Sequence, residues 1–365
     1  MKVVSLLPIL AFGDAVGNDA LAIYHGLKNA GYECVIAAES IDSRIEDKEN
    51  ILHADDLSFV SEDDLVIYHF STGHKLNQKF AQLKCKKILR YHNITPPHFF
   101  CGYSKNLLLS CMQGYQELLQ LRSRIDFCIA DSNYNKNELI RMGFSCEIYV
   151  VPILIPFEDY QKEPNQDIIE KYNDDGYTNF LFTGRISPNK RQEDVIAVFH
   201  LYQKLYNPKS RLFLVGKYDG MEAYYEKLVR YAENLEIQNI VFTGQVGFDE
   251  VLAYYRLADL FLCMSDHEGF CVPLVEAMNF EIPIVARAVA AVPETMGKGG
   301  ISVSREASLE EFAGVCHKIL NNRNLYNTVV MYQKEQLKIF SYIHVKELLL
   351  DVVGLITKNK TKEVN

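Results

Sequence analysis

The sequence predicts an α/β protein with two doubly wound, Rossmann-like domains, and three observations support this fold class. Short apolar runs alternate with amphipathic segments along most of the chain, as parallel strands alternate with their connecting helices. The alternation stops at residues 152–175, where prolines and mixed charges cluster, and then resumes. A length of 365 residues accommodates two domains of ordinary size. We therefore expect domains at residues 1–157 and 158–340, and a final helix within 341–365.

Composition and charge exclude several classes of protein. With 48% hydrophobic residues and a net charge of -9, the chain is globular and lacks the basic character of a general nucleic-acid-binding protein. Its nine cysteines form no C-x-x-C pair, which favours reduced thiols in a cytosolic protein. No apolar run approaches the roughly 18 to 20 residues that a spanning helix needs. We expect a cytoplasmic protein that is at most peripheral to a membrane.

The first half begins as a nucleotide-binding fold does, with a strand over residues 3–9, a loop and a helix over residues 20–29. The glycine and polar residues of this loop are Gly13, Asp14, Gly17 and Asn18. The loop is not G-x-G-x-x-G, which argues against a nicotinamide dehydrogenase. Capping of the helix by Asn18 or Asp19 is the alternative role of its polar residues.

Further strands of the first domain are expected at residues 34–38, 65–70, 87–91, 127–130 and 148–151. His92 and Asn93 follow one of these strands directly, and two prolines then force the chain out of regular structure. We expect both residues on a rigid loop at the sheet edge, although a single histidine is more often structural. The stretch Asp131–Asn133 is expected to cap the next helix.

A basic segment stands out in this acidic chain. Residues 74–90 contain six Lys or Arg residues and no acid. A basic, partly amphipathic helix of this kind could rest on an anionic membrane surface. An ordinary solvated helix face is the alternative.

The second half opens with a strand over residues 179–183, followed by Gly184, Arg185 and Lys190 and then a helix over 192–205. An arginine and a lysine five positions apart, on a loop that leads into a helix N-terminus, suit a diphosphate. A solvated basic loop is the alternative. Further strands are expected at 212–215, 240–243, 260–264 and 283–286, helices at 222–234 and 249–257, and two or three helices over 308–357.

Two carboxylates bracket the most informative stretch. Glu268 and Glu276 are eight positions apart, after the predicted strand at 260–264, and Pro273 between them suits the first turn of a helix. Both carboxylates should then point into one crevice at the edge where open α/β sheets bind ligands. Carboxylates accept hydrogen bonds from sugar hydroxyls, and free N–H groups around residues 270–272 suit a phosphate. Chance spacing is the alternative explanation.

The string Ser265-x-x-Glu268-Gly-Phe-x-x-Pro273-x-x-Glu276-Ala-Met resembles the E-x7-E signature of family 4 glycosyltransferases, which are retaining enzymes with the GT-B fold. The resemblance is strong over residues 183–294 and weaker in the first half. It departs at Cys271, where the family more often has glycine. The GT-B fold implies two Rossmann-like domains that face each other across a cleft, with the last helix crossing back to the first domain.

The resemblance also implies roles for individual residues. Arg185 and Lys190 would bind the diphosphate of a sugar nucleotide, and Glu276 its ribose. Glu268 would hold the sugar hydroxyls, and His92 would contact the sugar from the other domain. The expected catalytic residues are His92, Glu268, Arg185 and Lys190. The expected substrate-binding residues are Glu276, Gly269, Phe270, Cys271, Val272, Gly184, Gly13, Asp14, Gly17, Asn18 and Asn93.

The implied reaction is transfer of a hexosyl group from a UDP- or GDP-linked sugar to a hydroxyl of a saccharide or lipid-linked saccharide. It would retain the anomeric configuration and serve polysaccharide or glycolipid synthesis. No cofactor and no metal are expected, because no D-x-D stands in a suitable loop and the basic clamp would supply the positive charge. The alternatives are a sugar-nucleotide epimerase or phosphorylase on the same architecture, a non-catalytic sugar-nucleotide-binding subunit, and a dinucleotide-binding regulator.

Overall fold

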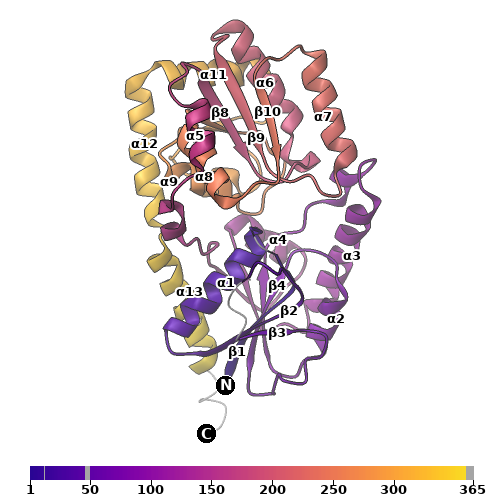
Figure 1. The fold of residues 1–365 in the computed structure, drawn as a ribbon. Coiled ribbons are helices and arrows are strands. Elements are labelled where there is room, and N and C mark those ends of the chain that lie inside the picture. Colours follow the sequence, from indigo (N-terminus) through magenta and orange to yellow (C-terminus); the bar gives the residue numbers. More distant parts are fainter. Residues whose placement is uncertain (12, 46–49, 359–365) are drawn as a thin grey trace. The chain divides into compact units, whose positions relative to one another are not determined.

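Two parallel sheets form the framework of the chain, one in each of two units (Figure 1). The structure is a computed structural model that describes residues 1–11, 13–45 and 50–358. The first unit comprises Met1–Pro96, Leu109–Pro156 and Ile339–Asn365. The second comprises Pro97–Leu108 and Phe157–Lys338, so a short segment from the first half of the sequence belongs to the second unit.

The first unit contains a seven-stranded sheet in the order β3-β2-β1-β4-β5-β6-β7, with every neighbouring pair parallel. Its strands are β1 (Lys2–Leu10), β2 (Glu33–Ile41), β3 (Ile51–His53), β4 (Leu65–Phe70), β5 (Lys86–Tyr91), β6 (Phe127–Ala130) and β7 (Glu147–Val150). The helices of the first half and the last helix are α1 (Ala15–Asn29), α2 (Lys75–Gln82), α3 (Lys105–Leu121), α4 (Asn133–Arg141) and α13 (Tyr342–Lys358). The strand order reverses between β1 and β4, which makes this point the switch point of the sheet.

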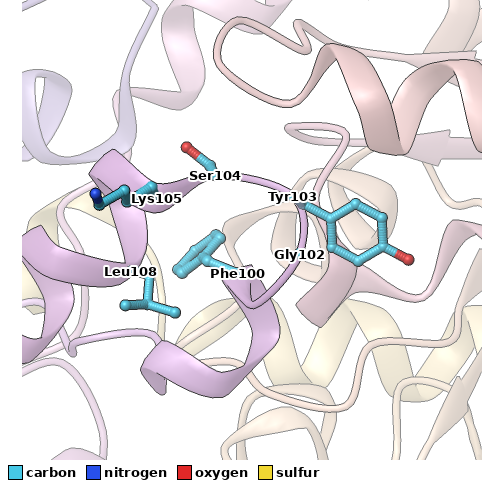
Figure 2. Close-up of a pocket in the computed structure, with 6 residues that line it drawn as sticks. All are labelled: Phe100, Gly102, Tyr103, Ser104, Lys105 and Leu108. Carbon is cyan, nitrogen blue, oxygen red and sulfur yellow. The ribbon is translucent and has the colours of Figure 1, made fainter.

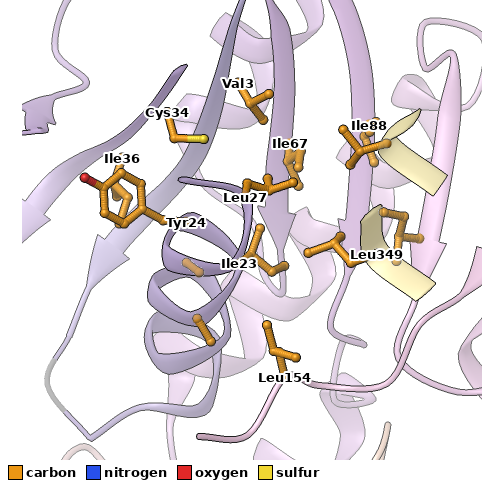
Figure 3. Close-up of a cluster of buried hydrophobic side chains, with 14 of the residues drawn as sticks. Val3, Ile23, Tyr24, Leu27, Cys34, Ile36, Ile67, Ile88, Leu154 and Leu349 are labelled. Atoms are coloured by element: carbon orange, nitrogen blue, oxygen red, sulfur yellow. The ribbon is translucent and has the colours of Figure 1, made fainter. Parts of the chain in front are cut away.

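Helices cover both faces of this sheet, because successive strand residues point to opposite sides. On one face, Ile23 and Leu27 of α1 and Leu349 of α13 pack with Val3 and Ile67 in a buried apolar cluster (Figure 3). On the other face, Phe80 of α2 stacks on Tyr68 of β4 with ring centroids 4.6 Å apart. The last helix is therefore part of the core of the first unit.

The second unit contains a six-stranded sheet in the order β10-β9-β8-β11-β12-β13, again with parallel neighbours. Its strands are β8 (Thr178–Thr183), β9 (Ser210–Val215), β10 (Ile240–Gly244), β11 (Leu260–Cys263), β12 (Ile284–Arg287) and β13 (Ile301–Val303). Its helices are α5 (Gln166–Tyr172), α6 (Gln192–Leu205), α7 (Glu222–Asn234), α8 (Phe248–Leu257), α9 (Val272–Asn279), α10 (Val292–Met296), α11 (Leu309–Asn321) and α12 (Arg323–Lys338). Short 3-10 helices lie at η1 (Pro97–Phe100), η2 (Phe157–Gln161) and η3 (Pro188–Lys190). The switch point lies between β8 and β11.

The second sheet is also covered on both faces. Phe180 of β8 packs edge-on against Phe199 of α6 on one face. Leu181 of the same strand belongs to the cluster that Tyr255 of α8 and Leu274 of α9 form on the other face. The two doubly wound domains expected from the sequence are thus confirmed, and strands β3 and β13 are additions that the apolar runs did not predict.

Two expectations about the first unit need correction. Helix α1 begins at Ala15 rather than at residue 20, and its N-cap is Asp14, whose carboxylate accepts from the N–H of Gly17. Neither Asn18 nor Asp19 caps the helix, because both lie inside its first turns. Phe12, in the same loop, lies outside the described residues.

The basic segment is not one helix either, because it divides between α2 and β5. Lys75 and Lys79 pair with Glu39, and Arg90 is buried. Lys84 pairs with the exposed Glu62 at 3.5 Å. Among the residues described, no helix combines the length and the apolar character required to cross a membrane.

Candidate functional site

The loop that follows β8 carries the predicted clamp. It runs beside the end of β9, where the N–H of Gly184 donates to Val215 and that of Ile186 donates to Lys217. Gly216 makes this approach possible, because a Cβ at that position would lie 2.0 Å from the carbonyl oxygen of Gly184. The loop ends in η3, so that Lys190 lies just before α6.

Lys190 and Glu268 form the central ion pair of the second unit. The Nζ atom of Lys190 lies 2.6 Å from each carboxylate oxygen of Glu268. The hydroxyl of Ser265 donates to Oε1 of Glu268 at 2.7 Å and fixes its orientation. The side chain of Glu268 is 7% exposed and that of Lys190 is 21% exposed. Burial works to lower the pKa of Lys190, but the charge of Glu268 outweighs it and raises that pKa.

Backbone contacts explain why these two side chains meet. Strands β8 and β11 are neighbours across the switch point, so the loops that follow them share one sheet edge. The N–H of Asp266 donates to the carbonyl of Asn189 at 2.8 Å, and the Asn189 side chain donates to the carbonyl of His267. The two loops are therefore held together on both sides of the ion pair.

Glu276 lies one turn into α9, as the sequence predicts, but its partners differ from those of Glu268. Its oxygens accept hydrogen bonds from the hydroxyls of Tyr160 at 2.7 Å and Tyr255 at 2.6 Å. The hydroxyl of Tyr255 also lies 2.6 Å from that of Thr183 at the end of β8. Burial raises the pKa of Glu276, while the two tyrosine hydrogen bonds act to lower it.

Arg185 does not share a partner with Lys190. Its Nη2 donates to the backbone carbonyl of Asp219 at 2.7 Å, and its Nε is buried without a hydrogen-bond partner in the described part of the chain. The guanidinium is thus anchored at one end only. It keeps N–H groups with which it could bind an anion.

The turn between Glu268 and α9 is fixed by α10. The carbonyl of Glu268 accepts from the N–H of Ala291, and the carbonyl of Phe270 accepts from the hydroxyl of Thr295 at 2.6 Å. Cys271 caps α9 with φ of 75°, in the left-handed region that favours glycine. Gly269 and Val272 complete this turn and the start of the helix.

His92 lies directly after β5, as expected, but its ring is tied into a buried polar network. Its Nδ1 lies 3.0 Å from a carboxylate oxygen of Asp131, and its Nε2 lies 2.9 Å from Nδ1 of His69. Arg90 pairs with both Asp19 and Asp131 in the same network. Burial lowers the pKa of His69 well below its usual value, so this ring is neutral.

Asn93 is also held by protein groups. Its backbone has φ of 73°, and its amide donates to Asn135 at 3.0 Å and to Glu138 at 2.8 Å. The stretch Asp131–Asn133 caps α4 as expected, through Ser132, whose hydroxyl accepts from the N–H of Asn135. In the first turn of α1, Gly17 lies so close to Ala11 that a Cβ at position 17 would be 2.7 Å from the carbonyl oxygen of Ala11.

Several of these residues were not predicted from the sequence. Tyr160 and Tyr255 look like ordinary core aromatics, and nothing in their spacing points to Glu276. Asp19 carries a weak signal, since it is an acid inside an otherwise apolar helix. Within the described residues, two groups bring three metal-ligand atoms within 4.8 Å of one another, namely Asp19, His69 and His92, and Cys263, Glu268 and Cys271. Arg90 pairs with Asp19 in the first group, and the two histidines of that group have no negative charge with which to balance an added cation.

A separate pocket of about 380 Å³ is formed by the end of η1 and the segment that follows it (Figure 2). Its lining residues are Phe100, Gly102, Tyr103, Ser104, Lys105 and Leu108. The hydroxyl of Tyr103 points away from Phe100 and accepts from Lys227 of α7 at 3.1 Å. None of the residues predicted for the site lines this pocket.

Comparisons of the sequence point to sugar-transferring enzymes. Residues 164–336 match the sequence model of the family described as "Glycosyl transferases group 1". Over 197 residues the chain is 27% identical to the serotype-specific mannosyltransferase WbdA of Escherichia coli, which covers 53% of this chain and 23% of WbdA. The chain thus spans about a quarter of the length of that relative.

Solved structures show the fold. Sucrose-phosphate synthase from Thermosynechococcus elongatus gives a TM-score of 0.76 at 15% identity, over 99% of this chain and 100% of that one. HepE of Anabaena, solved in complex with UDP-glucose, gives 0.76 at 16% identity, over 97% and 99%. The GT-B fold expected from the sequence is therefore confirmed. The match to group 1 glycosyl transferases covers 173 residues, slightly less than half of the chain.

Proposed function

We propose that this protein is a retaining glycosyltransferase that moves a hexosyl group from a nucleotide diphosphate sugar to a hydroxyl of a saccharide or lipid-linked saccharide. The observation that carries the proposal is the Lys190 and Glu268 pair at the switch point of the second sheet. Both residues lie within residues 164–336, the region that matches group 1 glycosyl transferases, and the pair supports the proposal because it sets a cation beside a carboxylate that could accept hydrogen bonds from sugar hydroxyls. Assignment to family 4 rests on the E-x7-E string.

The donor would be a UDP- or GDP-linked sugar. HepE, which shares the fold, was solved with UDP-glucose, and WbdA is named a mannosyltransferase. Glu276 has two oxygens that each accept one tyrosine hydrogen bond, so each keeps a lone pair for a ribose hydroxyl. The exposed part of Lys190 has a third N–H beyond the two that Glu268 accepts, and it would go to the diphosphate.

In the proposed mechanism, the leaving diphosphate gains negative charge as the glycosidic bond breaks. Arg185 and Lys190 would stabilise that charge where it develops. Glu268 would bind sugar hydroxyls and orient the ring, while His92 would contact the sugar. The leaving phosphate would itself accept the proton of the attacking hydroxyl on the same face. No protein nucleophile and no metal enter this scheme.

The first test is nucleotide binding by calorimetry or thermal shift with UDP, GDP, ADP, CMP and NAD. We expect one diphosphate to bind selectively, and binding to weaken in Glu276→Ala and Lys190→Ala. Lys204→Ala, on an exposed lysine of α6, is the matched control and should bind as the unaltered protein does. A folded protein that binds none of these nucleotides would refute the proposed donor site.

Product analysis separates the rival functions. Transfer releases a free nucleoside diphosphate, and NMR of the new anomeric centre tests retention. An epimerase would leave the mass of the sugar nucleotide unchanged. A non-catalytic subunit would bind the nucleotide without turnover on any acceptor, and a dinucleotide-binding regulator would select NAD.

Cytoplasmic location and contact with an anionic membrane stay predictions. Of the basic segment, Lys84 is the most exposed cation, at 82%, and it already has an acidic partner in Glu62. Co-sedimentation with anionic vesicles should fall with salt and in Lys84→Ala if the segment binds lipid. Binding that ignores lipid charge and salt would refute this role of the segment.

A further inference from the structure

Two cysteine thiols lie beside the Lys190 and Glu268 pair, and the proposed function gives them no role as thiols. Cys263 ends β11 and Cys271 caps α9, and their side chains hydrogen-bond to each other. The two sulfur atoms and a carboxylate oxygen of Glu268 all lie within 4.8 Å of one another. Cys263 is 1% exposed, Cys271 is 7% exposed and Glu268 is 6% exposed.

We propose that Cys263, Cys271 and Glu268 form a binding site for a thiophilic divalent cation such as Zn²⁺. Two sulfurs and one carboxylate oxygen are a donor set that zinc accepts, with bonds of about 2.0 to 2.3 Å. Tetrahedral bonds of that length place the donor atoms roughly 3 to 4 Å apart, so the present spacing requires little movement. Ser265 supplies the outer hydrogen bond that orients the carboxylate.

The charges of the surrounding groups suit a cation. With both thiols protonated, the charges of Glu268 and Lys190 cancel. A divalent cation would replace one proton on each thiol, and two thiolates and one carboxylate then balance the cation and the ammonium of Lys190. The buried site is neutral in both states, which avoids the cost of an uncompensated buried charge.

Cation binding would also affect the proposed donor site. The cation would bind the carboxylate of Glu268, which pairs with Lys190 and which we assign to the sugar hydroxyls. We therefore expect Zn²⁺ to weaken donor binding and slow transfer. This consequence rests on the proposed function, whereas the cation site itself does not.

A second thiol pair in the chain provides a matched control. The sulfurs of Cys128 and Cys146 lie 3.5 Å apart in the first unit. In the part of the chain that the structure describes, this pair does not belong to a group of three metal-ligand atoms. A variant of this pair should therefore leave the proposed cation site intact.

The test uses the full chain, freed of metal by a chelator and titrated with Co²⁺ and Zn²⁺. We expect one cation per chain, a thiolate-to-cobalt absorption band and release of about two protons, one from each thiol. Cys271→Gly suits the left-handed backbone at that position, so it removes a ligand without adding strain. It and Cys263→Ala should weaken binding at least about tenfold, the lower limit seen for altered zinc surroundings.

Cys128→Ala should keep the band and the affinity, and circular dichroism should verify that every variant folds. The absence of a thiolate band in the unaltered protein would overturn the site, as would unchanged binding in both Cys263→Ala and Cys271→Gly. For each variant, the transfer rate in the presence of Zn²⁺ is compared with the rate of the same variant without metal. Cation binding that leaves nucleotide binding and transfer unchanged would support the site and refute its link to the donor.

Discussion

Breaking the ion pair between Lys190 and Glu268 separates its structural from its catalytic contribution. In Lys190→Met the carboxylate of Glu268 keeps Ser265 as a partner but loses its cation. In Glu268→Gln the ammonium loses its anion. The double variant removes both charges and keeps side chains of similar size.

The structure sets the magnitudes. Removing one partner of a fully buried pair costs about 3 to 5 kcal/mol, and the 21% exposure of Lys190 lowers our expectation to roughly 2 to 4 kcal/mol of unfolding free energy. The double variant should recover most of that loss, because no uncompensated charge remains buried. Turnover should depend on the positive charge of Lys190. Losing that charge should cost about 2 to 4 kcal/mol of transition-state stabilisation, which is about 30- to 1000-fold in rate.

The assay combines urea unfolding with release of nucleoside diphosphate at saturating acceptor. We expect the double variant to be nearly as stable as the unaltered protein and at least as slow as Lys190→Met, because it also loses the carboxylate that we assign to the sugar hydroxyls. Lys204→Met, on the surface of α6, should change neither quantity. Unchanged turnover in Lys190→Met would remove this lysine from the mechanism, and recovery of activity in the double variant would make its role purely structural.

Three further predictions address the surroundings of this pair. Tyr255→Phe should lower the free energy of unfolding by roughly 1.5 to 3 kcal/mol in urea titrations, because it removes a hydrogen bond to the half-buried Glu276 carboxylate. It should cost more than Tyr160→Phe, because the hydroxyl of Tyr255 also pairs with that of Thr183, and a smaller loss than in Tyr160→Phe would contradict this ranking. Arg185→Ala should slow turnover by about 30- to 1000-fold at little cost in stability, and equal turnover would exclude it from the clamp. Burial lowers the pKa of His267 to about 4 from an ordinary value near 6.5. The free energy of unfolding should therefore fall by up to about 3 kcal/mol as the pH drops from about 6.5 to about 4, because the unfolded chain takes up the proton first. Thermal melts of His267→Gln should show a shallower dependence of stability on pH than those of the unaltered protein. Parallel dependences in the two proteins would refute this role of His267.

The sequence was sufficient for the fold because its signals are local. Apolar runs and turn residues located the strands of both sheets to within a few residues, and α6 and α7 match their expected bounds. The short strands β3 and β13 were not predicted, because three residues are too few to show a hydrophobic periodicity. The start of α1 was misplaced because Gly17 and Asn18 are poor helix formers, and Asp14 caps the helix before them.

The site was predictable where it follows sheet topology and unpredictable where it depends on tertiary packing. Lys190 and Glu268 belong to the loops that follow two neighbouring strands, so the strand order predicts that these side chains lie close together. Tyr160 and Tyr255 come from η2 and α8, and their contacts with Glu276 arise only when these elements pack on α9. The basic segment does not form the single helix that was expected, because it divides between α2 and β5, and Glu39, far away in sequence, pairs with two of its lysines.

The network around His92 illustrates how a correctly located residue can have unexpected chemistry. Its Nδ1 faces the Asp131 carboxylate, so that nitrogen carries a proton and donates it. Its Nε2 faces Nδ1 of the neutral His69, so one of these two nitrogens carries a proton and donates it to the other. Both ring nitrogens are thus engaged before any sugar arrives. For His92 to contact a sugar through Nε2, the hydrogen bond to His69 must break, and Asp131 would then hold the ring in place.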